Sequence, residues 1–384
     1  MKKIAYLTLI ILFIGCKEHQ NDSTKNRQEK EIEIEFNKNI ETIGIILDLS
    51  ELGDFILSLS NEDRNYEFIR LIRKEFNDFI KHPAVLNFNK LNELNLAKSN
   101  HFYYGLSFTN LPEFEINHQK YDEFYSSDKF TKHQVDSILN DFDKSIKDFY
   151  IKANLEKYFK EKEQLYKNIS SEIRKIIPNN ILETMENYFG EYGNSYVICP
   201  SPTIPTGWNF GPDKKKGDYK IFYYLTGPSY DIKPSKNNLS EITVNDNLGF
   251  NDKENLRDLA IHEFGHSFVR FLDIKSNKIL IEKLSLLNTE ELKANFKKIG
   301  EGTEWNSIFE EHLVRANEIL IWRKLGEVKI AKEKLEYEFK TERILYINEF
   351  VQSLEKFENN RKEYLTLESY FSELINDLTE IKIK

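Results

Sequence analysis

The chain has 384 residues, of which 40% are hydrophobic and 13% aromatic, enough to bury a sizeable core in one large or two modest domains. Its 63 acidic and 54 basic residues give a net charge of −9. This acidic balance argues against a nucleic-acid partner, because binding to phosphates needs a basic patch.

The N-terminus has the order of a secretion signal. Two lysines precede an apolar run at residues 4–14, and a Gly-Cys pair that ends at Cys16 closes it. This order is typical of a bacterial lipoprotein signal, in which cleavage before the cysteine is followed by lipid attachment. We therefore predict a signal peptide at residues 1–15 and a lipid anchor at Cys16, which would hold the protein to a membrane of the cell envelope. The mature chain would begin Cys-Lys-Glu, which favours the outer membrane, on its periplasmic or its surface face.

Residues 16–34 are predicted to form a flexible tether, and residues 35–190 a helical N-terminal region. Most of the tether has almost no apolar side chain, and such composition is typical of disorder. Alternation over residues 31–36 predicts a short strand at its end. Apolar residues then recur at helical spacing in four segments, residues 43–59, 66–81, 130–175 and 181–189.

Residues 191–384 are predicted to form a second region, in which a few strands precede several helices. Two strands are expected at residues 196–199 and 220–225, with a Pro- and Gly-rich loop between them. Helical spacing follows in residues 280–296 and 305–325, and in two pieces on either side of Asn359-Asn360. The whole chain is therefore expected to be α+β and mostly helical.

The central feature of this region is a His-Glu-x-x-His motif. His262, Glu263 and His266 supply its three fixed positions. On a helix the two histidines lie one turn apart on the same face, so both rings can reach one Zn²⁺ at about 2.0–2.1 Å. Glu263 can then take a proton from the water that the metal activates, as the general base of a metal-assisted hydrolase.

The residues around the motif support a helix. Asn251 and Glu254 have the spacing of a capping box, and apolar residues recur every three or four positions as far as Phe271. We expect this helix to end near Lys275. Gly265 costs about 1 kcal/mol in a helix relative to alanine, which suggests that another segment approaches closely there.

A catalytic zinc needs a third protein ligand beside the two histidines. We choose Glu311, on the predicted helix at residues 305–325, because a glutamate from a second helix completes a His₂Glu site. Arg315 lies one helical turn further on and could hold this carboxylate in place. Three other residues of this helix remain alternatives as the third ligand: Glu310, His312 and Glu318.

The reaction would also need a donor for the oxyanion of its transition state. The tyrosines are too numerous, 20 in the chain, for any one of them to be chosen on composition. The candidates are Tyr223, Tyr224, Tyr230, His312 and Tyr364.

Three blocks of sequence together resemble a bacterial family of unknown function. They are the HEFGHSFV block of the motif, the E-x-x-V-R-A block that begins at Glu311, and the F-E-x-N-R-x-x-Y-x-T block from Phe357 to Thr366. The family consists of zincin-like lipoproteins similar to gluzincin metallopeptidases, and the likeness covers roughly residues 35–380. It implies a zincin-like core, in which a small sheet, the motif helix and a glutamate helix come together in residues 191–384, with a helical N-terminal region and C-terminal tail.

The resemblance also implies roles for individual residues. His262, His266 and Glu311 would bind zinc, and Glu263 would be the catalytic base. Tyr364 lies in the terminal block, which makes it a candidate catalytic residue.

These inferences predict a membrane-anchored zinc-dependent hydrolase, most simply a metallopeptidase that acts on peptides or proteins. The alternative is a binding or structural lipoprotein that keeps the zincin fold without catalysis. A third interpretation, in which the motif is accidental and the helical parts bind a glycan or a protein, is separated from the first two by metal analysis.

Overall fold

The computed structural model describes residues 30–61, 66–94, 98–113, 130–178, 180–232 and 236–381. The signal peptide and the lipid site Cys16 lie outside these residues. Glu31–Lys384 form one compact unit. It is mostly helical and contains a small mixed sheet, so the α+β prediction is confirmed. None of the helices in the described ranges is both long enough and apolar enough to cross a membrane.

The sheet has five strands within the described residues: β1 lies near the N-terminus, and the other four lie in the middle of the chain. Their order is β1-β2-β5-β3, and β4 also pairs with β5. β1 and β2 pair in parallel, as do β2 and β5, whereas β3 and β4 are antiparallel to β5. The strands are β1 Ile32–Ile34, β2 Ser195–Pro200, β3 Asn209–Phe210, β4 Asp213–Lys216 and β5 Tyr219–Thr226.

The sheet matches the sequence predictions only in part. β2 and β5 lie where alternating and apolar residues placed them. β1 forms where the alternation at residues 31–36 predicts a strand, at the end of the segment assigned to the tether. It is ordered there because β2 provides it with a partner. β3 and β4 occupy part of the Pro- and Gly-rich segment that we expected to be a loop. They form because β5 offers them a free edge.

The first half of the chain supplies a group of helices around α1 (Lys38–Leu49), which is buried along most of its length. The segment at residues 66–81 is not one helix, because α3 ends at Glu75 and a short 3₁₀ turn follows at Asn77–Phe79. The remaining helices of this half are α2 Glu51–Ser58, α3 Glu67–Glu75, α4 Pro83–Asn92, α5 Lys98–Gly105, α6 Lys132–Lys152, α7 Leu155–Glu161, α8 Glu163–Ile176 and α9 Asn180–Phe189.

The second half adds the helices that surround the motif. The helix expected at residues 280–296 is in fact two, because a turn interrupts it and the Thr289 side chain caps a new helix by accepting from the Leu292 N–H. The expected C-terminal pieces are three helices rather than two. The helices are α10 Lys253–Phe268, α11 Lys275–Glu282, α12 Glu290–Ile299, α13 Trp305–Lys324, α14 Val328–Lys340, α15 Ile347–Asn359 and α16 Leu367–Thr379.

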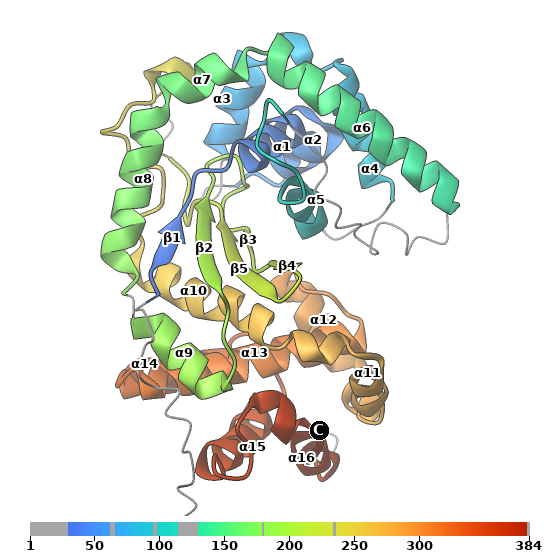
Figure 1. Cartoon of the computed structure of the whole chain (residues 1–384), viewed down its shortest axis with the longest axis vertical. Coiled ribbons are helices and arrows are strands. Elements are labelled where there is room, and N and C mark those ends of the chain that lie inside the picture. The colour runs from blue at the N-terminus through green and yellow to red at the C-terminus, as the bar shows by residue number, and fades with distance from the viewer. Residues whose placement is uncertain are drawn as a thin grey trace, which may run out of the picture. The chain divides into compact units, whose positions relative to one another are not determined.

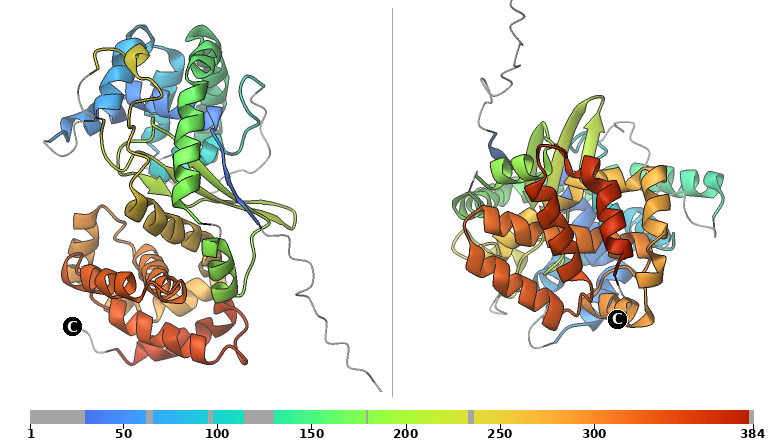
Figure 2. Two further views of the ribbon diagram at one scale, coloured as in Figure 1. Left: turned by 90° about the vertical axis from the view of Figure 1, so that its left-hand side faces the viewer. Right: turned by 90° about the horizontal axis from the view of Figure 1, so that it is seen from below.

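These helices form layers beneath the sheet (Figure 1). α10 packs against β5 on one side and α13 on the other, and α13 is in turn packed against α14 and α15. Figure 2 shows the red helices α15 and α16 on the side of α13 that faces away from the sheet. α13 is consequently buried on nearly every face, so polar side chains on it need partners inside the protein.

Candidate metal centre

The motif helix α10 begins one residue later than its sequence suggested. Asp252, rather than Asn251, is the N-cap, and its carboxylate accepts a hydrogen bond from the Asn255 N–H at 3.2 Å. The helix ends at Phe268 instead of continuing to Lys275, because a 3₁₀ turn takes over immediately after it. The His-Glu-x-x-His residues therefore lie in its last two turns.

Packing on opposite sides of α10 fixes the orientation of the motif. Phe264 faces the sheet, where its ring meets the edge of Tyr196 at a centroid distance of 5.5 Å. Gly265 faces α13, and a Cβ atom added there would lie 3.3 Å from Cγ1 of Val314. The close neighbour expected from this glycine is thus α13, the helix that carries the predicted third ligand.

The two histidines and Glu311 come together between α10 and α13. His262 Nε2 lies 3.6 Å from one carboxylate oxygen of Glu311, and His266 Nε2 lies 3.4 Å from the other. One ligand atom from each of the three residues lies within 4.8 Å of the others. Ligands at 2.0–2.1 Å in a tetrahedron are about 3.3 Å apart, so these separations fit a zinc ion with small adjustments.

Two neighbouring glutamates orient the rings. Glu310 Oε1 lies 2.9 Å from His266 Nδ1, and Glu318 Oε2 lies 3.5 Å from His262 Nδ1. A protonated Nδ1 can donate to these carboxylates, which leaves each Nε2 free to bind a metal. Glu310 and Glu318, which the sequence left open as rivals of Glu311, lie on the Nδ1 side of the rings, whereas Glu311 lies on the Nε2 side.

Arg315 holds the Glu311 carboxylate, as their spacing predicts. Its Nε donates to Glu311 at 3.3 Å, and its other nitrogens pair with Glu338 at 3.1 Å and Glu301 at 3.3 Å. The guanidinium thereby links Glu311 to α14 and to the loop before α13. Three carboxylates around one cation keep Glu311 oriented toward the histidines.

The surroundings of the site carry an excess of negative charge. Among the described residues of this region, eight carboxyl groups, none more than 33% exposed, are accompanied by three fixed cations, so acidic groups outnumber basic ones. A bound divalent cation would offset part of this excess. The carboxylates are Asp213, Asp258, Glu263, Glu301, Glu310, Glu311, Glu318 and Glu338, and the cations are Arg270, Arg315 and Lys334.

Glu263 is buried beside the ligands. Burial raises the pKa of its carboxyl from 4.5 to about 8. The charge of His266 acts to lower this pKa, and the charge of Glu311 acts to raise it. A Cβ atom at Gly211 would lie only 2.0 Å from the carbonyl oxygen of Glu263. The segment between β3 and β4 thus passes directly over Glu263, and only glycine fits there.

The candidates for the oxyanion donor separate once they are placed. The Tyr224 ring faces Phe264 of α10, so it lies on the motif side of the sheet, and its hydroxyl donates to Asn209 at 3.1 Å. Burial raises the pKa of this hydroxyl, and the charge of Glu263 adds to the shift. Tyr223 is the next residue along β5 and points to the opposite face. The Tyr230 hydroxyl bonds to Asn247 instead.

His312 and Tyr364 are not part of the site. The His312 ring stacks on Phe296 at 5.3 Å and its Nδ1 bonds to a backbone carbonyl of α13, so it is a core residue. Tyr364 lies between α15 and α16 with its ring 5.1 Å from Tyr370, and none of its interactions with described residues involves the ligands. In the same block, Arg361 donates to the Tyr188 carbonyl at 3.0 Å, which ties this connection to α9.

Sequence reasoning missed two cations of the site. Arg270 lies one turn beyond His266, and its guanidinium donates to Asp213 at 2.8 Å and lies 3.7 Å from Glu310. Its position four residues after His266 was the one sequence feature that could have indicated a place near the site. Lys334 of α14 pairs with Glu318 at 2.7 Å, and no spacing rule connects these two helices.

Comparison with known proteins gives a family but no function. A family model described as a domain of unknown function (DUF4932) matches residues 32–377. No curated protein matches the chain, and no solved structure does. The match contains the sheet, α10 and α13, so the whole candidate site lies within it. What the site does has to be argued from its residues.

Proposed function

Because the chain belongs to a family described only as a domain of unknown function, DUF4932, we propose its function from the site itself: a zinc-dependent hydrolase that cleaves peptide bonds. The prediction of a family of unknown function is confirmed, and the matched residues 32–377 nearly coincide with the expected residues 35–380. The zincin-like core, the metal and the activity are proposals. The observation that carries them is the placement of two imidazole nitrogens at 3.4 and 3.6 Å from the oxygens of one carboxylate.

The donor set suits zinc better than calcium or magnesium. Two imidazoles and one carboxylate from His262, His266 and Glu311 are typical ligands of catalytic zinc, whereas the harder cations take mostly oxygen ligands. The excess of buried carboxylates around the site supports a divalent cation of either kind. The nitrogen ligands decide between them.

The residues around the ligands can carry out hydrolysis. When bound, zinc supplies a Lewis acid that polarises a carbonyl and lowers the pKa of water. Glu263 is placed to accept a proton from the attacking water and to pass it to the leaving nitrogen. Tyr224 is the oxyanion candidate that lies on the motif side of the sheet. Arg315 and Glu310 keep the ligands oriented during these steps.

A peptide is the substrate that the surroundings favour. β3 and β4 lie at the edge of the sheet next to α10 and pair with β5 on one side. An extended peptide can pair with the backbone of such an edge, which would lay its carbonyl groups beside Glu263. A small sheet over the motif helix is also the arrangement that a zincin-like core predicts.

One observation favours a second candidate, a metal-binding lipoprotein without catalysis. The ligand side chains are only 12%, 16% and 10% exposed for His262, His266 and Glu311. Water can reach them, but a peptide would need a neighbouring segment to move. A structural metal site has no such need.

The location of the protein is proposed from its N-terminus. Residues 1–15 would be removed as a signal peptide, and lipid on Cys16 would anchor the rest of the chain to the outer membrane of the cell envelope. Mass spectrometry of the purified protein tests this directly. An N-terminus other than Cys16, or an unmodified cysteine, would contradict the anchor.

The function is tested with the variant Glu263→Gln. Purified protein is assayed for bound zinc and for cleavage of a peptide mixture followed by mass spectrometry, with and without a chelator. We expect about one zinc per chain in wild type and variant, and a loss of turnover of about 10²–10⁴-fold in the variant. Glu254→Gln, an exposed position on the same helix, is the matched control.

The two candidates predict different results. Zinc retention with no cleavage in the wild type, across the whole mixture, would support the non-catalytic candidate. Cleavage by Glu263→Gln at the rate of wild type would refute the assigned base. A wild-type protein that holds no zinc would refute both.

A further inference from the structure

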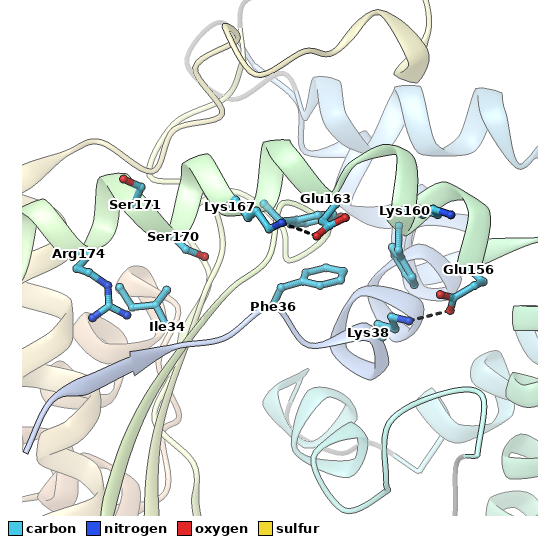
Figure 3. A pocket seen from close by; sticks show the side chains of 12 residues that line it. Ile34, Phe36, Lys38, Glu156, Lys160, Glu163, Lys167, Ser170, Ser171 and Arg174 are labelled. Carbon is cyan, nitrogen blue, oxygen red and sulfur yellow. Dashed lines mark hydrogen bonds and ion pairs between the residues drawn. The ribbon is translucent and has the colours of Figure 1, made fainter.

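A groove separate from the metal site runs between β1 and the helices α7 and α8. It has a volume of about 890 Å³. Figure 3 shows Ile34 and Phe36 in the space between β1 and α8, with Arg174 near Ile34. No residue that lines this groove belongs to the metal site. A ligand bound here would therefore not depend on the metal or on the proposed function.

β1 offers this groove a free strand edge. Among the described strands, its one partner is β2. The Glu35 N–H donates to the Ile198 carbonyl at 2.9 Å, so the backbone of Glu35 faces β2. Successive residues of a strand direct their backbone groups to opposite sides, and those of Ile34 and Phe36 therefore face away from β2. Such groups are what a peptide pairs with when it adds to a sheet as an extra strand.

The floor of the groove is apolar and largely aromatic. The Phe36 ring lies 3.8 Å from that of Tyr166 and 5.3 Å from that of Phe159, measured between centroids. The Tyr166 hydroxyl donates to the buried Glu41 at 2.9 Å, which holds the ring in place. Together with Ile34, these rings form a preformed surface for the apolar side chains on one face of an added strand.

The rim of the groove is positively charged. Four basic and two acidic side chains line it. Lys38 pairs with Glu156, and Lys167 pairs with Glu163. Within the described ranges, no carboxylate lies at ion-pair distance from either of the other two, Lys160 and Arg174, and both are exposed. The groove thus presents two uncompensated positive charges on a protein whose net charge is −9, and favours an anionic partner.

We propose that this groove binds an extended peptide with acidic side chains, which pairs with β1 as an added strand. The strand edge accounts for the extended backbone, the aromatic floor for apolar residues on one face, and Lys160 and Arg174 for acidic residues on the other. The chain's own segment at residues 17–30 has four basic and three acidic residues. Because it lacks an acidic excess, a separate peptide is the better match.

Binding is tested with the full chain and a fluorescein-labelled nonapeptide in which valine and glutamate alternate. Fluorescence anisotropy measures its dissociation constant at low salt and at 0.5 M NaCl. We expect binding that weakens as salt screens the charges, and much weaker binding of the same peptide with lysine in place of glutamate. Two further peptides test the backbone pairing: one is methylated on the amide nitrogen of every valine, the other on that of every glutamate. At least one of these two peptides should no longer bind.

A pair of double variants separates the groove from general charge effects. Lys160→Glu with Arg174→Glu should raise the dissociation constant about tenfold or more, because each reversal removes an attraction and adds a repulsion. Lys157→Glu with Lys175→Glu makes the same charge change on exposed residues of α7 and α8 that do not line the groove. This control should bind as the wild type does.

Three results would overturn the proposal. The first is no binding of the acidic peptide at 100 μM, a concentration well above typical micromolar affinities. The second is equal weakening by the groove variant and its control, or full binding of both methylated peptides. The third is binding of sodium dodecanoate in place of the peptide, which would make the groove a site for an anionic lipid.

Discussion

A buried acid far from the candidate site allows a quantitative prediction of stability. Glu41 lies on α1, is fully buried, and accepts a hydrogen bond from the Tyr166 hydroxyl at 2.9 Å. Burial raises the pKa of this carboxyl from 4.5 to about 8, and the nearby hydroxyl groups only partly oppose the shift. The perturbation is Glu41→Gln, which keeps the shape and an acceptor oxygen but removes the titration.

The sign of the effect follows from proton binding. Between pH 4.5 and 8 the folded state holds a proton on Glu41 that the unfolded state has lost, so stability falls as pH rises through this window. The contribution is fully present below pH 4.5 and is lost above pH 8. A shift of 3.5 units at 1.36 kcal/mol each gives an upper value of about 5 kcal/mol.

The assay is urea unfolding followed by circular dichroism between pH 5 and pH 9, with a chelator in every sample. At pH 5 we expect Glu41→Gln to lie within about 1 kcal/mol of wild type, since the hydrogen bond is largely preserved. At pH 9 the variant should be more stable by several kcal/mol. Glu51→Gln, an exposed position on α2, should show no such change. A difference between wild type and Glu41→Gln that stays constant across this range would refute the reasoning.

Three further predictions concern the site and its support. Glu311→Ala should leave purified protein with little bound zinc, as measured by mass spectrometry of the metal, whereas full occupancy would show that this carboxylate is no ligand. Glu310→Gln should weaken zinc binding about 10–100-fold, because it removes the charge that orients His266; competition with a fluorescent chelator measures this, and unchanged affinity contradicts the role. Phe268→Ala should destabilise the fold by about 3–5 kcal/mol, since its ring stacks on Phe189 at 4.5 Å, and a midpoint of urea unfolding equal to that of wild type would refute it.

Local patterns account for the elements that sequence reasoning placed correctly. β5 is a run of apolar and aromatic residues, α13 has helical spacing, and α9 ends where a glycine at residue 190 takes a positive φ. The short strands β3 and β4 have no such pattern. They depend on the free edge of β5, and this is a tertiary feature that no local window contains.

The break between α11 and α12 shows the same limit. Residues 283–289 include three leucines and neither glycine nor proline, so helical spacing predicts one continuous helix. In the structure Leu284 and Leu287 are buried while Leu286 is exposed, an arrangement that a turn provides. Packing of these leucines outweighs the local preference for a helix.

Within the site, the cluster of His262, His266 and Glu311 was accessible from sequence, and the residues that contact it were not. His262 and His266 follow from a spacing of four, and Glu311 follows from the helical face that it shares with Arg315. The distinct roles of Glu310 and Glu318 depend on which ring nitrogen each one meets, and only the packing of α13 on α10 decides this. Tyr364 was a candidate because of a linear block, and a linear block does not determine where its residues lie in space.

Because α10 supplies both imidazoles and α13 supplies Glu310, Glu311 and Glu318, the whole ligand assembly spans a single helix–helix interface. Occupancy by an ion and docking of these two helices must then be thermodynamically linked. A substitution that loosens their contact, such as one at Gly265 or Val314, would reduce affinity for the ion without altering a ligand. Conversely, loading with the ion would stabilise the docked helices, and slower hydrogen exchange of the α10 and α13 amides would reveal it.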